Sequence, residues 1–476
     1  MTHTSTEPAS RTDTRRFRRG IIATVVILAV LCAAFLVLTS GQGPKLSSAT
    51  VDTRQVVSQA DQQLRLFANQ NVAKVTAAEV SVSPAAPFTV TSQGQVIAVQ
   101  FSQRLDYGTR YTVSVNGITS QYQTVRSDLS YSFTTAAASI YYLQRADPAQ
   151  GADQLDNIIR TGVRGSARTI VYSTKHIQEF TVFPAVLAVV TLNDDHTDSL
   201  SLVSLSNSAQ IEHLVLPTAG TIQKLQSEPD VGVLGFVFTS AGDHAGLEFA
   251  NDLMTVDLTA LHTVTPVLGL NGTPLSVLDW LFLSGTTSVV AQAYDQSVLL
   301  IDPKKPSSST PLGVYAALEG SAPDGKSIVV ADVFSRILLT IATGKTQRLE
   351  THQVGDAKTY GGDLELLGDG TASVQQVAVV DTGSGQYASY LIYQSGAVGT
   401  GKTRILFGGK DYKGSIDGFS VSPNGQYVAA NVVPDYAMSV SDGYFVNPRA
   451  TSITTVFIDI ATGNIVRSVA GFDQAW

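Results

Sequence analysis

From about residue 137 onward, short turn-forming motifs recur at intervals of about 40 to 55 residues. Each motif is followed by an apolar, β-branched run of strand length and then by a second one, as in YVAANVVPDYAM and TTVFIDIATGN. Repetition with this period, with about four short strands per unit, is typical of a β-propeller rather than of one large sandwich. The motifs are Pro184, Pro229 with Asp230, Gly285, Asp324 with Gly325, Asp369 with Gly370, and Asn424 with Gly425.

The number of these motifs sets the expected size of the propeller. Six motifs, together with the strand-like segments IYYLQR (140–145) and TIVYS (169–173), predict six or seven blades, and seven is favoured. The propeller is predicted to span residues 137–476. Its first and last units must then meet to close the ring.

Two of the repeated segments resemble a known propeller group. SAPDGKSIVVA (321–331) and SVSPNGQYVAA (420–430) are similar to the S-x-D-G-K repeat of WD40-like propellers of the TolB-type periplasmic group. The histidine and Trp-Asp signatures of ordinary WD40 blades are absent, and Trp280 and Trp476 do not occupy repeating positions. The resemblance implies an all-β propeller.

A separate domain is predicted for residues 48–135. PFTVTSQGQVIAVQF gives two strands, and YTVSVNGI alternates Tyr111, Val113 and Val115 before an expected Asn-Gly turn at 116–117. The segment VVSQADQQLRLFANQ fits both helical and strand spacing. The motif from Leu105 to Gly117 resembles bacterial Ig-like domains of surface-layer and cell-wall proteins, which implies a β-sandwich, strand structure at 62–68 and a possible spacer role.

The first forty residues predict a membrane anchor. Residues 21–38 are uncharged and apolar, and with Gly20 and Thr39 they reach about 30 Å as a helix, the thickness of the bilayer hydrocarbon. The positive-inside rule then predicts a cytoplasmic tail at 1–19, a single span at 20–40 and an extracytoplasmic remainder. A signal peptide cleaved near Thr39 to Gly41 is the alternative. The flanking basic residues are Arg11, Arg15, Arg16, Arg18 and Arg19.

Composition excludes several functional classes. Charged residues make up 15% of the chain, the net charge is −8, and basic residues are sparse beyond the first twenty positions. Such a chain offers no basic face for a phosphate backbone, so no nucleic-acid partner is expected. Cys32 is the only cysteine and lies in the predicted span, which excludes intrachain disulfides and thiolate metal clusters.

The stretch GAVGTGKT (396–403) matches the P-loop pattern G-x-x-x-x-G-K-[ST]. A P-loop needs a strand before it and a helix after it, so that backbone N–H groups face the phosphates. The preceding SYLIY meets the first condition, but RILFGGKDYKG contains Gly408 and Gly409 and reads as a strand and a turn. We therefore expect a hairpin connection in blade six and no bound nucleotide.

No metal, cofactor or catalytic residue is predicted. NDDHTD (193–198) has oxygen ligands that suit calcium, but it lacks the EF-hand order and also fits a solvated hairpin tip. The sequence contains no H-x-H, H-E-x-x-H or G-x-S-x-G motif. The seven histidines are His3, His176, His196, His213, His244, His262 and His352.

Propeller ligands commonly bind at the central channel, which suggests a small set of residues to examine. Asp279, Asp332 and Asp417 are possible channel-lining acids, with turn or cap aspartates as the alternative interpretation. Aromatic residues available for a contact surface, or for ordinary blade packing, are Tyr360, Tyr412, Tyr436 and Tyr444.

The sequence thus predicts a non-enzymatic, membrane-anchored binding or scaffolding platform for a protein or glycan of the cell envelope. The alternative is an extracytoplasmic carbohydrate-active enzyme, a lyase or hydrolase, with its site at the propeller channel. A sensor is a third hypothesis, for which about nineteen cytoplasmic residues leave little room for an output domain.

Overall fold

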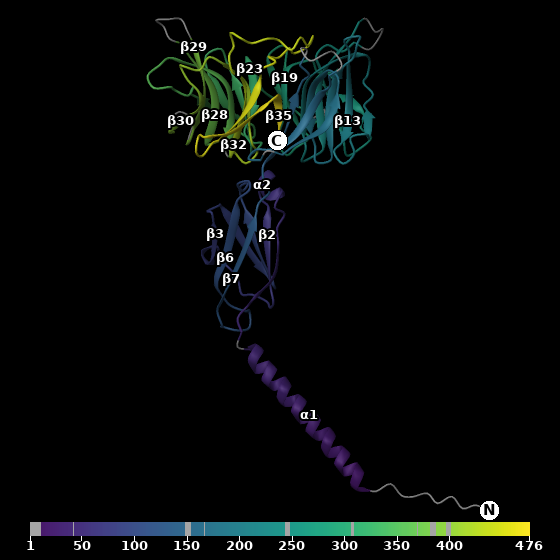
Figure 1. The fold of residues 1–476 in the computed structure, drawn as a ribbon, viewed down its shortest axis with the longest axis vertical. Coiled ribbons are helices and arrows are strands. Elements are labelled where there is room, and N and C mark those ends of the chain that lie inside the picture. Colours follow the sequence, from purple (N-terminus) through teal and green to yellow (C-terminus); the bar gives the residue numbers. More distant parts are fainter. Residues whose placement is uncertain are drawn as a thin grey trace, which may run out of the picture. The chain divides into compact units, whose positions relative to one another are not determined.

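The computed structural model describes residues 11–40, 42–147, 154–165, 167–242, 248–305, 309–368, 370–380, 387–396 and 401–476, and in the first range the side chains of 17–32. The chain divides into two compact units, Met1–Ala136 and Ala137–Trp476 (Figure 1).

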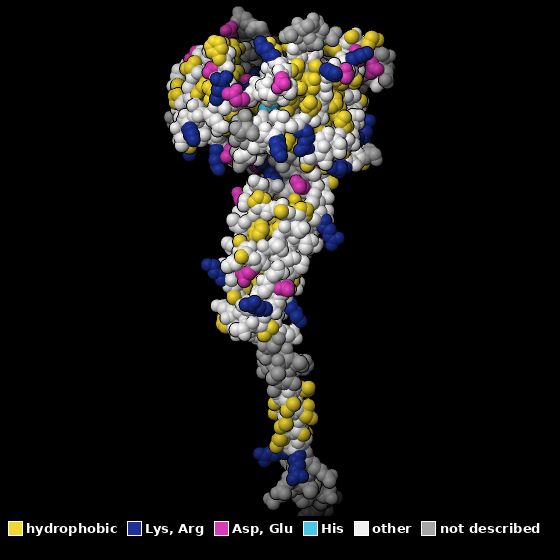
Figure 2. Space-filling model, turned by 90° about the vertical axis from the view of Figure 1, so that its left-hand side faces the viewer, with side chains coloured by type: hydrophobic (Ala, Val, Ile, Leu, Met, Phe, Trp, Pro, Cys, Tyr) yellow, Lys and Arg dark blue, Asp and Glu magenta, His cyan; other side chains and the backbone are white. Residues whose placement is uncertain are grey.

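Helix α1 (Arg11–Ser40) covers the whole predicted span 20–40. Its described side chains, residues 17–32, are solvent-exposed, and Figure 2 shows hydrophobic side chains along the described part of this helix, with basic side chains toward its lower end. Within the described residues, no helix combines the length and the hydropathy needed to cross a membrane.

The remainder of the first unit is a β-sandwich. One sheet has the order β1-β2-β5-β4 and the other the order β3-β6-β7, and both contribute to one apolar core that includes Leu64, Val99 and Val113. The strands are β1 (Leu46–Thr50), β2 (Gln63–Ala68), β3 (Val80–Ser83), β4 (Phe88–Gln93), β5 (Val96–Phe101), β6 (Arg110–Ile118) and β7 (Ser127–Thr134).

Two local features of this sandwich differ from what the spacing of apolar and turn-forming residues predicts. The segment VVSQADQQLRLFANQ, whose spacing fits both a helix and a strand, is part helix and part strand. A single helical turn, α2 (Gln55–Ser58), is followed by strand β2, as the resemblance implied for 62–68. The Asn-Gly turn expected at 116–117 is wrong, because both residues lie within β6. Gly117 has φ +68° where the pairing register with β7 shifts, so the glycine serves a β-bulge rather than a chain reversal.

The described residues of the second unit form seven four-stranded antiparallel sheets, one of the two blade counts that the sequence allowed. In Figure 1 the sheets are arranged as the blades of a propeller. Blade 1 has the order β10-β9-β8-β35, and blades 2 to 7 are β11–β14, β15–β18, β19–β22, β23–β26, β27–β30 and β31–β34, each in chain order.

The strands of blades 1 to 4 are β8 (Ser139–Gln144), β9 (Asp156–Gly162), β10 (Arg168–Thr174), β11 (Ile177–Val182), β12 (Val186–Leu192), β13 (Asp198–Ser204), β14 (Ile211–His213), β15 (Gly220–Glu228), β16 (Val233–Ser240), β17 (Asp252–Asp257), β18 (Val264–Pro266), β19 (Val277–Phe282), β20 (Val289–Ala293), β21 (Ser297–Ile301) and β22 (Thr310–Val314).

The remaining strands are β23 (Ala317–Ser321), β24 (Ser327–Ala331), β25 (Arg336–Thr340), β26 (Lys345–Leu349), β27 (Thr359–Leu367), β28 (Ala372–Val380), β29 (Tyr387–Gln394), β30 (Thr403–Gly408), β31 (Ser415–Val421), β32 (Tyr427–Val433), β33 (Thr454–Asp459), β34 (Ile465–Ala470) and β35 (Phe472–Ala475).

The second strand of a blade is mostly apolar because neighbouring blades cover both of its faces. All seven residues of β32 are buried. Between blades 3 and 4 the packing is close enough to require a glycine. A Cβ at Gly235 would lie 2.5 Å from the ring of Trp280.

The ring closes through the C-terminal strand. β35 pairs with β8, so Phe472 lies opposite Leu143 and Ala475 opposite Tyr141. The first strands of successive blades contact one another, and β35 contacts β11 of blade 2 and β32 and β33 of blade 7. β35 and the first strands of blades 2 to 7 therefore surround the central channel, as the closure argument from sequence required.

The two faces of the propeller carry different loops. The first-to-second and third-to-fourth strand turns lie on one face, here called the turn face, and all six motifs of the sequence repeat fall in its first-to-second strand turns. The second-to-third strand loops and the links between blades lie on the other face, called the groove face. Of the motif residues, Asp369 lies outside the described residues, and Gly370 of the same motif is described.

Candidate functional site

Each of the seven innermost strands has an irregularity in its pairing with the next strand. At or beside each irregularity lies a charged residue, and two of these residues, Lys224 and Asp473, have positive φ angles of 54° and 50°. Bulges redirect side chains, so every blade contributes one charged residue beside the channel. This channel belt consists of Glu179, Lys224, Asp279, Glu319, Asp363, Asp417 and Asp473.

Members of the channel belt connect neighbouring blades. Glu179 accepts hydrogen bonds from the backbone N–H groups of Lys224 (3.2 Å) and Leu225 (2.6 Å) of blade 3. Lys224 Nζ in turn lies 3.0 Å from Asp279 Oδ1 of blade 4. These contacts join three blades in series.

Two arginines connect two further pairs of neighbouring blades, blades 5 and 6 and blades 7 and 1. Arg336 pairs with Glu319 of its own blade and donates to the carbonyl of Gly362 in blade 6 (2.9 Å). Arg449 lies 2.7 Å from Asp417 Oδ2 in blade 7 and 3.9 Å from Asp473 Oδ1 in blade 1.

Burial raises the pKa of two carboxyl groups of the belt. Burial raises the pKa of Asp473 above its ordinary value, and the nearby Arg449 opposes this rise only in part. Burial also raises the pKa of Glu179, although its backbone N–H donors act in the opposite direction. Each of these two carboxyl groups is therefore more easily protonated than an ordinary exposed carboxylate.

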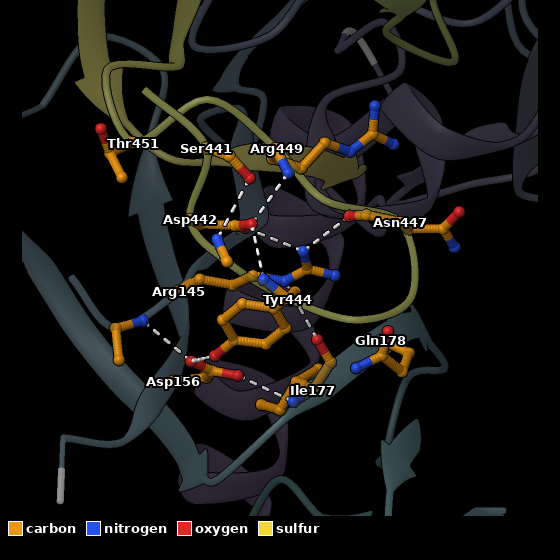
Figure 3. Close-up of polar contacts among 12 residues, drawn as sticks. Arg145, Asp156, Ile177, Gln178, Ser441, Asp442, Tyr444, Asn447, Arg449 and Thr451 are labelled. Atoms are coloured by element: carbon orange, nitrogen blue, oxygen red, sulfur yellow. Dashed lines mark hydrogen bonds and ion pairs between the residues drawn. The ribbon is translucent and has the colours of Figure 1, made fainter. Parts of the chain in front are cut away.

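A long loop of blade 7, residues 434–453, is held over blade 1 by a buried ion pair (Figure 3). Arg145 Nη1 lies 3.0 Å from Asp442 Oδ2, and the two side chains are only 3% and 4% exposed. Arg145 also donates to the carbonyl oxygens of Asn447 (2.8 Å) and Ile177 (3.3 Å). Its guanidinium lies 4.2 Å from the centre of the Tyr444 ring.

A second buried contact fixes the same loop. Asp156 is fully buried and accepts hydrogen bonds from the backbone N–H groups of Ala146 (2.8 Å) and Ile177 (2.7 Å) and from the Tyr444 hydroxyl (Figure 3). Burial, followed by the bond to Asp156, raises the pKa of Tyr444. The tyrosine is therefore a neutral hydrogen-bond donor that ties blade 7 to blade 1.

A groove of about 400 Å³ lies beside this clamped loop. Its walls come from blades 1, 2 and 7 and include His176, Asn193, His196 and Tyr444. Phe445 stacks on His196 with ring centres 4.5 Å apart, yet the residue is 72% exposed. The groove is thus a mixed aromatic and polar surface on a rigidly held loop.

Exposed large apolar side chains in the described propeller loops are concentrated on the groove face. Four of them, Tyr436, Met438, Val440 and Phe445, are 65% to 77% exposed and belong to the clamped loop. Leu261 alone lies on the turn face among these loops. The other groove-face residues are Leu155, Val215, Leu270, Tyr294, Val333 and Phe334.

The three acids predicted for the channel have different positions. Asp279 and Asp417 lie on innermost strands β19 and β31 and form the ion pairs described above. Asp332 lies in the β24–β25 turn, where it accepts hydrogen bonds from the N–H groups of Phe334 and Ser335, so the turn interpretation holds for it.

The four tyrosines predicted for a contact surface also lie in different surroundings. Tyr436 is exposed in the clamped loop, and Tyr444 is the buried tie to Asp156. Tyr360 is exposed on β27, and Tyr412 packs edge-on against Phe407. One of the four therefore contributes to the groove-face apolar surface and one supports it from beneath.

The other sequence motifs have structural roles. Residues 193–197 connect β12 and β13 as a hairpin, and Asp198 begins β13. No group of three or more potential metal ligands gathers among the described side chains. The P-loop-like stretch joins β29 and β30 of blade 6, with residues 397–400 outside the described ranges. Strand β30 begins at Thr403, where a P-loop would begin a helix.

Sequence reasoning missed Arg145, Asp156 and Asp442. The ion pair joins residues 297 positions apart, and none of the three belongs to a repeated motif. One usable signal is that Asp442 sits in the long insertion between β32 and β33, because long loops in compact repeats are often functional.

Comparisons with known proteins give distant likenesses of fold. No family model and no curated protein matches the chain. A putative 6-phosphogluconolactonase from Bacteroides uniformis is 12% identical, with 70% of this chain and 97% of that chain covered and a TM-score of 0.42. The β-propeller domain of the Trilobed protease from Pyrococcus furiosus is 8% identical, with 60% and 92% covered and a TM-score of 0.37.

A third similar structure is the acylaminoacyl peptidase from Pyrococcus horikoshii, which is 11% identical, with 70% of this chain and 50% of that chain covered and a TM-score of 0.44. At this level of similarity, none of these proteins transfers an activity or a ligand to this chain.

Proposed function

We propose that the protein is a non-enzymatic binding or scaffolding platform of the cell envelope, which holds a protein or glycan partner on the groove face. The observation that carries this proposal is the loop of blade 7. It exposes Tyr436, Met438, Val440 and Phe445 while Arg145 and Tyr444 fix it from beneath. A rigid surface rich in exposed aromatic and apolar groups suits recognition, because little side-chain order is lost on binding.

The proposed address follows from the N-terminal segment. Apolar side chains surround α1, and basic residues precede them, which supports a single-pass anchor at 20–40 with a cytoplasmic tail and an extracytoplasmic propeller. We further propose that the sandwich is an Ig-like spacer and that the propeller is of the TolB-like type. Topology reporters at residue 10 and at the C-terminus test the address, and a cytoplasmic C-terminus would contradict it.

The platform is tested by capturing partners from envelope extract with the full chain. We expect the double variant Met438→Ser, Phe445→Ser to weaken capture of a recovered partner by about 30-fold, as central interface residues do. Leu261→Ser is the matched control, because this residue is 91% exposed on the turn face and should leave capture unchanged. Equal loss with both variants, or no partner alongside measurable turnover of a substrate, would reject the platform.

One observation favours the enzymatic alternative, a lyase or hydrolase acting on carbohydrate. Asp417 and Asp473 converge on Arg449 at the channel, and burial raises the pKa of Asp473. Glycoside hydrolysis requires one protonated and one ionised carboxyl group. Release of reducing sugar from envelope polysaccharide that is lost in Asp473→Asn and kept in Asp332→Asn would support this function.

A further inference from the structure

A second cavity of about 270 Å³ lies at the channel, separate in its chemistry from the apolar groove-face loops. Its lining comes from the end of β8, from β11, β15 and β35, and from the clamped loop. The lining residues that matter here are Arg145, Gln178, Glu179, Phe180, Arg449 and Asp473. The volume far exceeds the roughly 10–15 Å³ that one water requires.

Three residues that line this cavity each carry a buried polar atom with no hydrogen-bond partner among the described residues. The atoms are the donors Arg145 Nη2 and Arg449 Nε and the acceptor Gln178 Oε1. The Arg145 side chain is 3% exposed and Gln178 is 2% exposed, so bulk water does not readily satisfy these groups. Unpaired buried polar groups are costly and uncommon, and a cluster of three in one cavity indicates a ligand-binding site.

The remaining groups of the wall restrict the chemistry of that ligand. The two arginines are already paired with Asp442 and Asp417, and Glu179 and Asp473 add two further carboxyl groups. The wall therefore has no excess of positive charge that would favour an anion. It mixes donors and acceptors, and Phe180 supplies an apolar surface.

We propose that this cavity binds a neutral sugar residue. Each hydroxyl group both donates and accepts, so a sugar can take hydrogen bonds from Arg145 and Arg449 and donate to Gln178. Hydroxyls also pair with Glu179 and Asp473 whether these carboxyl groups are ionised or protonated, which an ammonium group does not do equally well. This site goes beyond the proposed platform function, because it concerns a small ligand in the channel.

The test uses calorimetric titration of the full chain in mild detergent with a panel of neutral monosaccharides, glucose, galactose and N-acetylglucosamine. Glucuronate, inorganic phosphate and alanine are the anionic and zwitterionic probes. We expect saturable binding of at least one neutral sugar and weaker binding of the charged probes. Preference for the anions or for alanine, or no binding by any neutral sugar at millimolar concentration, would overturn the assignment.

Two variants remove single ligand contacts. Arg449→Lys keeps a positive charge beside Asp417 but lacks Nε, and Gln178→Met keeps the side-chain length but lacks the acceptor. We expect affinity for the sugar to fall about 10-fold or more in Arg449→Lys and about 3- to 10-fold in Gln178→Met. Unchanged affinity in both variants would contradict the site.

Matched controls separate loss of contact from loss of stability. Arg336→Lys changes another ion-paired arginine of the channel, in blade 5, and Gln292→Met changes another glutamine that is 2% exposed. Both should bind sugar normally, even where they unfold at lower denaturant concentration. Sugar binding that survives the groove-face variants of Met438 and Phe445 separates this site from the platform, so that either proposal can fail alone.

Discussion

The groove face and the turn face of the propeller are built from the same seven blades but differ in how their loops are stabilised. On the turn face, short connections repeat with a glycine of positive φ, such as Gly285, Gly325 and Gly425. On the groove face, a long loop is held by the buried ion pair of Arg145 with Asp442 and by the hydrogen bond from Tyr444 to Asp156. The repeated face provides architecture, and the irregular face provides the surface that can vary for recognition.

The largest expected effect breaks the groove-face clamp. Asp442→Ala leaves the Arg145 guanidinium buried without its carboxylate, and we expect the free energy of unfolding to fall by about 3–5 kcal/mol. Denaturant unfolding measures the change. An effect below about 1 kcal/mol would show that the loop is not held by this pair.

The second prediction compares how the free energy of unfolding depends on pH at a buried carboxyl group of each face. Burial raises the pKa of Glu365, near the turn-face end of β27, from 4.5 to about 8, and the pKa of Asp198, at the groove-face hairpin, from 3.8 to about 6. The folded state binds these protons more tightly than the unfolded state does. Stability is therefore greatest below the unfolded pKa of each group and is lost as pH rises through the folded pKa.

Glu365→Gln should accordingly remove a loss of a few kcal/mol between about pH 4.5 and 8, at about 1.4 kcal/mol per pH unit at most. Asp198→Asn should affect only the narrower window between about pH 4 and 6. Urea unfolding at pH 5 and pH 8 distinguishes them. Identical pH profiles for the two variants would argue against the difference in their burial.

A smaller effect refines the role of Tyr444. Tyr444→Phe removes the hydroxyl from Asp156 but keeps the ring beside Arg145, and Asp156 retains its two backbone donors. We expect a loss of about 1–3 kcal/mol in the free energy of unfolding, with normal ring closure. No loss would mean that the ring contact alone anchors the loop.

The smallest effect is expected for an ion pair of the turn face. Lys326 Nζ lies 3.8 Å from Asp324, and 79% of the lysine side chain is exposed. Because solvent screens such a pair, Lys326→Ala should change the free energy of unfolding by about 0–1 kcal/mol. A cost similar to that of Asp442→Ala would remove the distinction between the two faces.

The same contrast explains what could be predicted from the sequence. The turns of the turn face could be predicted because each first-to-second strand turn needs glycine or another turn-forming residue at a fixed place in the repeat. The closure of β35 on β8 followed from ring geometry. Arg145 and Asp442 could not be paired in advance, because no local pattern connects residues 297 positions apart. In the sandwich, the turn predicted at Asn116 and Gly117 was wrong because a β-bulge and a hairpin turn favour similar residues.

The position of Arg145 directly after β8 has a mechanical consequence. β8 is the first strand of the propeller unit, so tension transmitted along the chain into Ser139 passes through the β8–β35 pairing and reaches Arg145 within seven residues. From there the ion pair with Asp442 conveys it straight to the surface proposed to hold a partner. Tension between a bound partner and the proposed membrane anchor would thus be borne by two short-range attachments, the β8–β35 pairing and the Arg145–Asp442 ion pair, before any other blade is pulled apart.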